Sequence, residues 1–485
     1  MSPEARSPRE AILQFLTLLQ SPARILVAIS GGSDSTGLLL LLNEAVKAAP
    51  HLKISLCAAT VDHALRAGSA DEAREVAALC TSLGIAHAIM SWQGGKPKTG
   101  IMAAAREARY GLLAEAAETF GADLIVTGHT YDDQRETLAM RGVRTDQVSS
   151  GIADAVLFNR RFWILRPLLF SSRADIRAFL RERGAGWIDD PSNEDVKYER
   201  VRIRRQLSAD AGAERNIRAI WDERLALSAE GAEWLDRHFR LHGGLLGQVM
   251  PDGLRQDRAV LDYALGRLTA VFGGQPFAPG RAQMERLLSF ATGEEPGRMT
   301  AGRVVFDLRR DGLYLTRESR GILPLVVKPG EAGVWDGRFW ARNGSAAPIA
   351  IETAATHSPS FLCLSQESSA PKSLGAEDTS SWTESITART RGGWIPVTST
   401  GMRRNMRDLP KAAWKRAVAS APTLSVEKAS LSPESTPPID LMPYFAPFDR
   451  FLTRFDFIFA NRLSAVFATA PYARPPLRSI DGKTI

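Results

Sequence analysis

The segment Ser30–Thr36, read SGGSDST, constrains the fold of this chain more than any other. It follows the apolar run 25–29 and precedes a helix-compatible stretch, so the pattern predicts a strand, a tight loop and a helix. Two adjacent glycines let consecutive backbone N–H groups turn towards an anion, and the helix that follows adds the positive end of its dipole. The segment therefore predicts a phosphate-binding loop at the end of a buried strand.

Asp34 is the unusual member of this loop. A carboxylate beside bound phosphates repels them unless a cation lies between, so we interpret Asp34 as a Mg²⁺ ligand, direct or through water. No lysine follows the glycines, so this is not the Walker A pattern. An ordinary strand-to-helix turn with a serine or aspartate cap is the alternative interpretation.

Strand and helix signals alternate over the first 205 residues, which predicts an α/β fold with a Rossmann-like, doubly wound parallel sheet. The expected strands are 25–29, 54–61, 85–92 and 124–127, and the expected helices lie near 36–49, 70–83, 100–120 and 132–141. In such sheets ligands bind at the carboxyl ends of the strands. The polar segments that begin at Ser30, Asp62 and Gly128 all lie at such ends.

The length of 485 residues predicts two or three domains. We expect an α/β domain over 1–205, a mainly helical domain over 206–330, and a smaller α+β region over 331–485. Long helices are expected at 217–241 and 254–272, with strand-like pieces around 304–315. Segments 355–390 and 420–440 are rich in serine with alanine or proline and are typical of linkers or insertions.

A second motif, Gly128–Thr137, follows the strand at 124–127. If a helix begins near Asp132, then Asp132, Asp133 and Glu136 crowd one helical turn. Like charges so placed cost stability unless a cation, a basic residue or the reaction uses them. Helix capping by one or both aspartates is the alternative.

Two other segments indicate contacts with a nucleotide. Asp62 and His63 follow the second strand, where they are placed to contact a base or ribose; pairing of Asp62 with Arg66 is the alternative. Arg109 lies on the helix expected at 100–120 and is a candidate for phosphate contact, against the alternative of a solvated helix face.

Basic residues concentrate in two places. Between 160 and 206 there are 12 Lys or Arg residues against 7 Asp or Glu residues, which favours a polyanion beside the predicted site. A second basic patch, 402–416, contains one aromatic residue, Trp414, and fits contact with a phosphate backbone. A solvated helix face is the alternative in each case. The overall net charge of +7 is in the same direction.

Composition excludes several classes of protein. Three cysteines form no C-x-x-C pair, so a disulfide framework or zinc cluster is not expected and a reducing compartment, the cytoplasm, fits. No signal peptide is expected, because the amino-terminal segment has no long apolar stretch. The longest apolar run, 37–42, is too short to span a bilayer, so no membrane is expected as a partner.

Taken together and in this order, the motifs resemble those of the N-type ATP pyrophosphatases, or PP-loop enzymes, and within them the bacterial tRNA(Ile)-lysidine synthases. The resemblance covers roughly residues 20 to 205, and beyond 206 it is architectural only. It implies that 1–205 is the PP-loop catalytic domain, that 206–330 binds tRNA or serves as a linker, and that 331–485 binds tRNA. The segments that carry it are Ser30–Ser35, Val61–Arg66, Arg109–Tyr110, Gly128–Thr137, Arg166–Leu169 and Asp190–Asn193.

The resemblance implies a two-step ligation. ATP adenylates the C2 oxygen of the wobble cytidine of an isoleucine tRNA with a CAU anticodon, and free L-lysine then displaces AMP to form lysidine. Implied catalytic residues are Asp34, Arg109, Asp133 and Glu136, with Mg²⁺ held by Asp34 and Asp133. Implied ATP-binding residues are Ser30, Gly31, Gly32, Ser33, Asp34, Ser35, Asp62, His63, Gly128 and His129.

Lysine needs an acidic partner, because with an amine pKa of about 10.4 only about one amine in 10³ is neutral at pH 7. The candidates are Asp132, Glu136 and Asp190, and the residues leave the choice open. Candidates for tRNA binding are Arg200, Arg204 and Arg205, and a homodimer is a possible assembly.

Three positions depart from the family pattern. Thr130 stands where a second histidine is usual, Arg135 where a small residue is usual, and Val201 where asparagine is usual. They leave the expectation of nucleotide binding intact and bear on how tRNA or lysine is held. The alternative functions are a PP-loop tRNA thiolase, which relies on paired cysteines, and a tRNA-binding protein whose nucleotide site is only structural.

Overall fold

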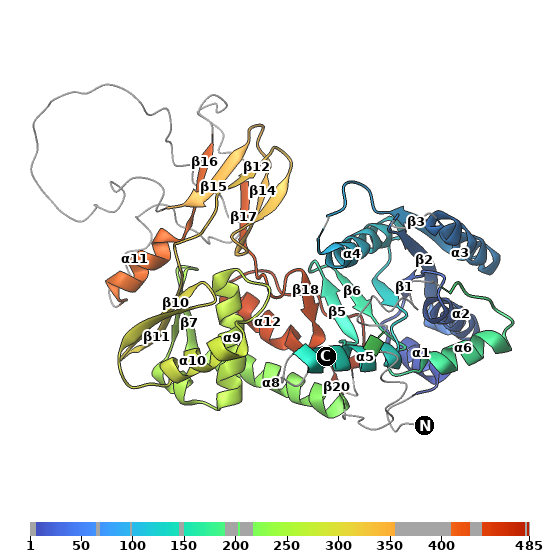
Figure 1. The fold of residues 1–485 in the computed structure, drawn as a ribbon, viewed down its shortest axis with the longest axis horizontal. Helices are drawn as coiled ribbons and strands as arrows, with labels where there is room; N and C mark the ends of the chain where they lie inside the picture. Colours follow the sequence, from blue (N-terminus) through green and yellow to red (C-terminus); the bar gives the residue numbers. More distant parts are fainter. Residues whose placement is uncertain are drawn as a thin grey trace, which may run out of the picture. The chain divides into compact units, whose positions relative to one another are not determined.

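The computed structural model describes residues 6–64, 68–97, 99–144, 150–189, 202–203, 217–354, 409–426, 439–480 and 483–484. The chain divides into two compact units. Figure 1 labels their helices and strands. Unit 1 comprises Met1–Leu225, Arg450–Phe455 and Ala473–Ile485, and unit 2 comprises Ala226–Asp449 and Asp456–Tyr472.

Unit 1 is built on a seven-stranded sheet with the order β18-β5-β6-β4-β1-β2-β3. Strands β6, β4, β1, β2 and β3 run parallel, whereas β5 pairs antiparallel with β6 and β18 pairs antiparallel with β5. This confirms the predicted parallel, Rossmann-like sheet. The bounds are β1 Ala23–Ala28, β2 Ile54–Asp62, β3 Ala86–Ser91, β4 Leu124–Thr127, β5 Ala155–Phe158, β6 Phe162–Leu165 and β18 Phe451–Thr453.

The order of the parallel strands places the site. From β1 the chain proceeds to β2 and β3 on one side, then crosses to β4 and β6 on the other. The carboxyl ends of β1 and β4 are therefore neighbours at the topological switch point, where open α/β sheets bind ligands. The loops that follow Ala28 and Thr127 meet there.

Helices cover this sheet, and the four predicted ones are confirmed with small shifts of their ends. Apolar side chains of α4 pack on the face that carries Leu26, Cys57 and Ile125, all of them fully buried. The helices of unit 1 are α1 Pro8–Leu18, α2 Ser33–Ala48, α3 Ser69–Leu83, α4 Ile101–Phe120, α5 Tyr131–Arg144 and α6 Arg173–Glu182, with a 3₁₀ turn at Pro50–Leu52 and a short pair β19 Ser479–Ile480 and β20 Lys483–Thr484.

The hairpin of β5 and β6 was not among the expected strands. Its two four-residue strands are too short to show a clear period, and they are joined by a tight turn with φ of 48° at Asn159 and 58° at Arg160. All eight strand residues are buried. The hairpin extends the sheet beyond β4 and gives β18 its partner.

Helix α8 (Ile217–His238) passes from unit 1 into unit 2. The prediction of a helix to residue 241 is wrong at its end, because Phe239–His242 pairs with β8 as a strand. A five-stranded antiparallel sheet follows, with the order β7-β8-β11-β10-β9, and it confirms the strand-like pieces near 304–315. Its bounds are β7 Phe239–His242, β8 Leu246–Val249, β9 Gly297–Ala301, β10 Val304–Arg309 and β11 Gly312–Arg317.

The helix expected at 254–272 begins later, at Arg258, after a 3₁₀ turn at Pro251–Arg255 and an Asp257 cap. The helices of unit 2 are α9 Arg258–Gly273, α10 Arg281–Ala291, α11 Lys411–Ala419 and α12 Phe457–Val466; the 3₁₀ turn Arg454–Asp456 spans the division between the units.

Two three-stranded sheets, β12-β15-β16 and β13-β14-β17, share one apolar core around Trp335, Phe339 and Ile351. Their bounds are β12 Leu325–Val327, β13 Ala332–Trp335, β14 Phe339–Asn343, β15 Ile349–Thr353, β16 Pro422–Val426 and β17 Ile439–Pro443. Across the described ranges of both units, none of the helices has the length and apolar character needed to cross a membrane.

Candidate functional site

The glycine loop after β1 is held in shape by its own hydroxyl groups. Gly31 has a φ of 85°, a left-handed conformation that favours glycine, and Gly32 precedes the first turn of α2. The Thr36 hydroxyl donates to the Gly31 carbonyl at 3.0 Å, and the Ser35 hydroxyl donates to the Gly32 carbonyl at 3.1 Å. The start of α2, with N–H groups that have no intrahelical partner, is thus fixed at the sheet edge.

Close approaches by other segments of the chain explain two glycines of the motifs. A Cβ on Gly128 would lie 2.8 Å from the Asp34 carbonyl oxygen, so the loop after β4 touches the first turn of α2. A Cβ on Gly31 would lie 2.6 Å from Ile188 Cδ1, and the Ile188 N–H donates to the Gly31 carbonyl at 2.9 Å. The segment after α6 therefore closes over the glycine loop.

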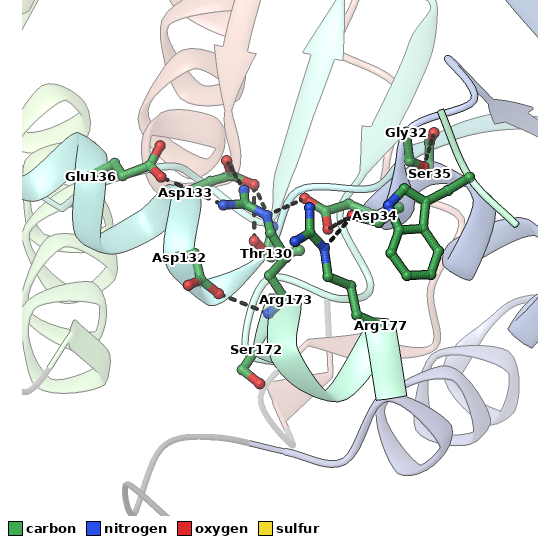
Figure 2. A network of polar contacts seen from close by, with 12 residues as sticks. Gly32, Asp34, Ser35, Thr130, Asp132, Asp133, Glu136, Ser172, Arg173 and Arg177 are labelled. Carbon is green, nitrogen blue, oxygen red and sulfur yellow. Dashed lines mark hydrogen bonds and ion pairs between the residues drawn. The ribbon is translucent and has the colours of Figure 1, made fainter. Parts of the chain in front are cut away.

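Arg173 brings the predicted carboxylates together (Figure 2). Its Nε donates to Asp34 Oδ2 at 2.9 Å, its Nη2 donates to Asp133 Oδ1 at 3.2 Å, and its Nη1 lies 3.7 Å from Glu136 Oε1. Its backbone N–H donates to Asp132 Oδ2 at 2.8 Å. One guanidinium group thus faces three carboxylates from two motifs about 100 residues apart in the sequence.

The site is largely withdrawn from solvent. The exposed fraction of the side chain is 20% for Asp34, 11% for Asp133, 2% for Glu136 and 18% for Arg173. Burial raises the pKa of Asp34, and the charge of Asp133 adds to this, although Arg173 opposes it. Burial lowers the pKa of Arg173, but Asp34 and Asp133 outweigh that effect and the pKa is raised. Arg173 thus contacts three carboxyl groups in a site that is largely buried.

Asp133 is both a helix cap and a member of this cluster. Its Oδ2 accepts hydrogen bonds from the Thr130 N–H at 2.8 Å and the Thr130 hydroxyl at 3.1 Å, while Oδ1 contacts Arg173. Helix capping and a role in the acidic cluster are thus compatible for Asp133, because its carboxylate has one oxygen for each. Thr130, where the family usually has a histidine, is fully buried as the residue before α5.

The second strand end brings Asp62, His63 and Arg109 together. Asp62 Oδ1 accepts the Ala64 N–H at 2.8 Å, which shapes the turn after β2. Burial lowers the pKa of His63, and the nearby charge of Arg109 lowers it further. His63 Nδ1 is buried, with no hydrogen-bond partner among the residues that the structure describes. His63 is therefore neutral at pH 7 with an unused ring nitrogen.

His129 is oriented by its own strand, since its Nδ1 lies 2.9 Å from the Thr127 hydroxyl. Arg166 and Tyr110, which belong to the motifs that carry the resemblance, contact each other. Buried Arg166 donates to the Ala153 carbonyl at 2.6 Å and reaches the Tyr110 hydroxyl at 3.5 Å. These contacts join the loop after β6 to α4 and to the entrance of β5.

The sequence reasoning missed the contribution of α6. Arg173 is the first residue of α6, and Arg177, one turn later, donates to the Ser33 hydroxyl at 3.2 Å and lies 5.6 Å from the Trp187 ring centre. A signal was present, because an arginine in the first turn opposes the helix dipole and indicates a nearby acid. The Ser172 side chain accepts the Asp175 N–H and marks where this helix begins.

Several candidates lie outside the described residues: Asp190, Arg200, Arg204 and Arg205, with Arg66 and Val201. Asp189, just before Asp190, accepts a hydrogen bond from Trp187 Nε1 at 3.0 Å and lies 3.5 Å from Arg177 Nη2. Asp189, the last described residue before Asp190, therefore lies near the glycine loop, because Arg177 contacts both Asp189 and Ser33.

The donor set can accept a divalent cation shared with phosphates. Within the described ranges, no group of three or more His, Cys, Asp or Glu side chains is placed to hold a metal ion by itself. Mg²⁺ bound to a nucleotide needs only one or two protein carboxylates, because phosphates and water complete its shell. Asp34 and Asp133 would meet that need, because their carboxylates contact the same guanidinium group and therefore lie close together.

Comparisons with known proteins agree with this geometry. Residues 6–211 match the PP-loop domain family. The chain is 47% identical over 351 residues to the tRNA(Ile)-lysidine synthase of Rhizobium meliloti (strain 1021), covering 70% of this chain and 77% of that protein. It is 35% identical over 473 residues to the tRNA(Ile)-lysidine synthase of Mesorhizobium japonicum, covering 93% of each.

A similar solved structure is the U34-tRNA thiolase NcsA from Methanococcus maripaludis with its [4Fe-4S] cluster. It has 18% identity and a TM-score of 0.33, and the alignment covers 43% of this chain and 80% of that chain. A similarity at this level does not bear on function.

Proposed function

The chain belongs to the tRNA(Ile)-lysidine synthase family, ATP-dependent ligases with a PP-loop domain, and we propose that its site performs both steps of lysidine formation. ATP adenylates the C2 oxygen of the wobble cytidine in an isoleucine tRNA with a CAU anticodon, and pyrophosphate leaves. The amine of free L-lysine then attacks C2, and AMP leaves. Both ATP and tRNA are available in the cytoplasm, where we place the reaction.

One observation carries the proposal: an acidic cluster adjoins a glycine loop at the switch point of the sheet. The loop and the start of α2 fit the leaving pyrophosphate, because their N–H groups and helix dipole favour negative charge. Asp34, Asp133 and Glu136 gather three carboxyl groups around Arg173 beside this loop. Carboxylate oxygens are ligands for Mg²⁺ and partners for an ammonium group, and the two steps use one of each.

For the first step, Asp34 and Asp133 would hold Mg²⁺, which neutralises charge on the phosphates and on the leaving pyrophosphate. Arg177 fixes Ser33 at the loop, and Ile188 covers Gly31, so the loop keeps its shape. Arg109 and the neutral ring of His63 lie at the neighbouring strand end. Arg109 supplies positive charge there for the phosphoryl or base oxygen.

For the second step, Asp132, Glu136 and Asp190 remain the candidates to bind the lysine ammonium group and to accept its proton. The Glu136 side chain is 2% exposed and faces Arg173, so a substrate amine would have to enter the cluster to contact it. Asp132 is less buried and uses Oδ2 to hold the first N–H of α6. Its second oxygen gives it the better access to a diffusing amine.

The cysteines provide no support for the thiolase alternative. Cys57 and Cys80 are buried, lie in β2 and α3, and are free; burial raises the pKa of each thiol to about 11. A thiol with such a pKa is protonated at pH 7 and is a poor nucleophile. Cys363 lies outside the described residues.

The test is an assay with ATP, Mg²⁺, labelled L-lysine and isoleucine tRNA carrying the CAU anticodon, followed by digestion of the tRNA to nucleosides. We expect the label in lysidine and pyrophosphate release that requires tRNA. Asp34→Ala abolishes adenylation but leaves tRNA affinity within a few-fold of the parent. Label in no nucleoside overturns the proposed function, and surviving adenylation in Asp34→Ala overturns the metal role of Asp34.

A further inference from the structure

The glycine loop after β1 has no cationic side chain of its own. No lysine or arginine occurs in Ser30–Val46, and Lys47 lies in the last turn of α2, about 20 Å along the helix axis from the loop. The one charged side chain of the loop is that of Asp34, a carboxylate. A loop that receives a triphosphate therefore depends for cationic side chains on other segments of the chain.

Helix α6 brings two arginines to this loop (Figure 2). The side chains of Arg173 and Arg177, one helical turn apart, both reach towards the first turn of α2. The guanidinium group of Arg173 contacts three carboxylates of the acidic cluster. Arg177 instead contacts the loop itself, because its Nε donates to the Ser33 hydroxyl at 3.2 Å. Arg177 is thus the arginine of α6 that faces the glycine loop.

The guanidinium group of Arg177 is held in place and still has unused donors. Its Cζ lies 5.6 Å from the centre of the Trp187 ring, and its Nη2 lies 3.5 Å from Asp189 Oδ1. Trp187 Nε1 donates to the same Oδ1 at 3.0 Å, which fixes the indole beside the guanidinium. A guanidinium group has five N–H bonds, and these contacts use one at Nε and one at Nη2. The other three have no partner among the described residues.

The charge of Arg177 is weakly compensated. Among the described residues, its acidic partner is Asp189, whose side chain is 76% exposed. An exposed carboxylate contributes little to an ion pair, because water screens the interaction. The Arg177 side chain is itself 38% exposed, so an anion in solution can reach it. Arg177 therefore places a positive charge with free donors at the rim of the glycine loop.

We propose that Arg177 binds the terminal phosphate of ATP and the pyrophosphate formed from it, an inference that rests on the proposed function. The paired N–H groups of a guanidinium match two oxygens of one phosphate. In Walker A loops a lysine of the loop contacts the terminal phosphates. Here the cation comes from a helix, 144 residues after Ser33 in the sequence.

The contact has a use in the first step of the reaction. Adenylation breaks the bond between the α-phosphorus of ATP and the oxygen that bridges to the β-phosphorus, and the electron pair of that bond stays with pyrophosphate. The leaving group gains negative charge as the bond breaks, so a guanidinium fixed beside it stabilises the transition state. Arg177 therefore acts on pyrophosphate, whereas AMP lacks the phosphates that it contacts.

The test measures dissociation constants of the full chain for ATP, AMP and inorganic pyrophosphate, with Mg²⁺ present and without tRNA or lysine. Arg177→Gln should bind ATP and pyrophosphate about tenfold more weakly than the parent, the size expected for charged hydrogen bonds lost at a partly exposed position. The affinity for AMP should stay within about twofold, because no such bond is lost.

Arg181→Gln is the matched control. Arg181 lies one turn farther along α6, is exposed, and lies 5.9 Å from the same Trp187 ring, with no carboxylate partner among the described residues. Its replacement removes the same charge from the same helix and should keep all three affinities within about twofold of the parent.

Arg177→Lys separates two roles of this side chain. An ammonium group keeps the positive charge at the rim of the loop but cannot reproduce the Nε contact with Ser33. Arg177→Lys should therefore recover part of the affinity for pyrophosphate that Arg177→Gln loses. Matching thermal unfolding of the three variants and the parent shows that all are folded.

Unchanged affinity of Arg177→Gln for ATP and pyrophosphate overturns the inference. An equal loss for AMP, or no recovery in Arg177→Lys, also overturns it, because Arg177 then only supports the loop through Ser33. An equal loss in Arg181→Gln assigns the effect to the general charge of α6, and a loss confined to tRNA affinity assigns Arg177 to RNA.

Lysidine formation by the parent chain is scored separately. A parent that forms lysidine while Arg177→Gln binds ATP and pyrophosphate normally refutes this inference alone. A parent that forms no lysidine, with weaker ATP and pyrophosphate binding in Arg177→Gln, refutes the proposed function alone.

Discussion

Replacing Arg173 by methionine removes the only guanidinium group that contacts Asp34, Asp133 and Glu136 together among the described residues. Methionine retains most of the apolar stem, so the change is chiefly one of charge. Loss of one partner from a fully buried ion pair costs about 3–5 kcal/mol. Arg173 and Asp34 are each about one-fifth exposed, so we expect the low end of this range, about 3 kcal/mol at pH 7.5.

The destabilisation depends on pH with a definite sign. Without Arg173, the pKa of Asp34 rises further above its value in the unfolded chain, because burial and Asp133 now act without opposition. A carboxyl group whose pKa is raised on folding carries no penalty when it is protonated in both states, and its penalty grows as pH rises through the folded-state pKa. The difference between variant and parent therefore shrinks from pH 7.5 towards pH 4.

Hydrogen exchange of peptides from β1 and β4 during urea unfolding measures this effect within unit 1 alone. Arg173→Lys is the matched control, since it keeps a charge but reaches fewer carboxylate oxygens, and it should lose less stability. Added Mg²⁺ should protect Arg173→Met more than the parent, because the guanidinium no longer competes for Asp34 and Asp133. A loss below about 0.5 kcal/mol, or one that does not change with pH, refutes the reasoning.

Two further predictions follow from single residues. Gly128→Ala places a Cβ against backbone atoms of Asp34, so it should lower the free energy of unfolding by about 2–3 kcal/mol and weaken ATP binding. Gly111→Ala is the control, because nothing lies near its Cβ. Equal urea midpoints for the two variants would contradict the close approach at Gly128. His63 has a lowered pKa, so the folded state resists its protonation and stability falls as pH drops below 6.5. His63→Gln should flatten that decline, and an unchanged pH profile of thermal unfolding argues against a buried neutral ring.

Some parts of the site depend on a single short segment each, and local sequence patterns predicted these parts. The strand ends at Ala28, Asp62 and Thr127 follow from apolar runs that stop at glycine or at charged residues. The crowding of Asp132, Asp133 and Glu136 follows from helical spacing alone. Each of these features is determined by residues within about one helical turn of it in the sequence. Such a pattern can be read directly from the sequence.

Other parts of the site depend on contacts between distant segments. Arg173 lies 139 residues from Asp34, and only the parallel pairing of β6 with β4 brings α6 to the glycine loop. Ile188 covers Gly31 in the same way. In unit 2, Arg416 of α11 pairs with Asp307 of β10, which lies more than 100 residues earlier in the chain. The pairing of each carboxylate with its cationic partner is therefore determined by the order and pairing of the strands.

Strand β18 has a consequence for synthesis of the chain. Residues 451–453 form the edge of the catalytic sheet, Phe451 packs against Tyr110 and Phe158, and Arg454 pairs with Asp154. Until the ribosome has made these residues, β5 presents an open edge of a kind that attracts other strands. The sheet of the amino-terminal two-fifths of the chain is thus completed only when the carboxyl-terminal part has been synthesised. A fragment that stops near residue 225 lacks β18, so its sheet has an open edge and is prone to aggregate.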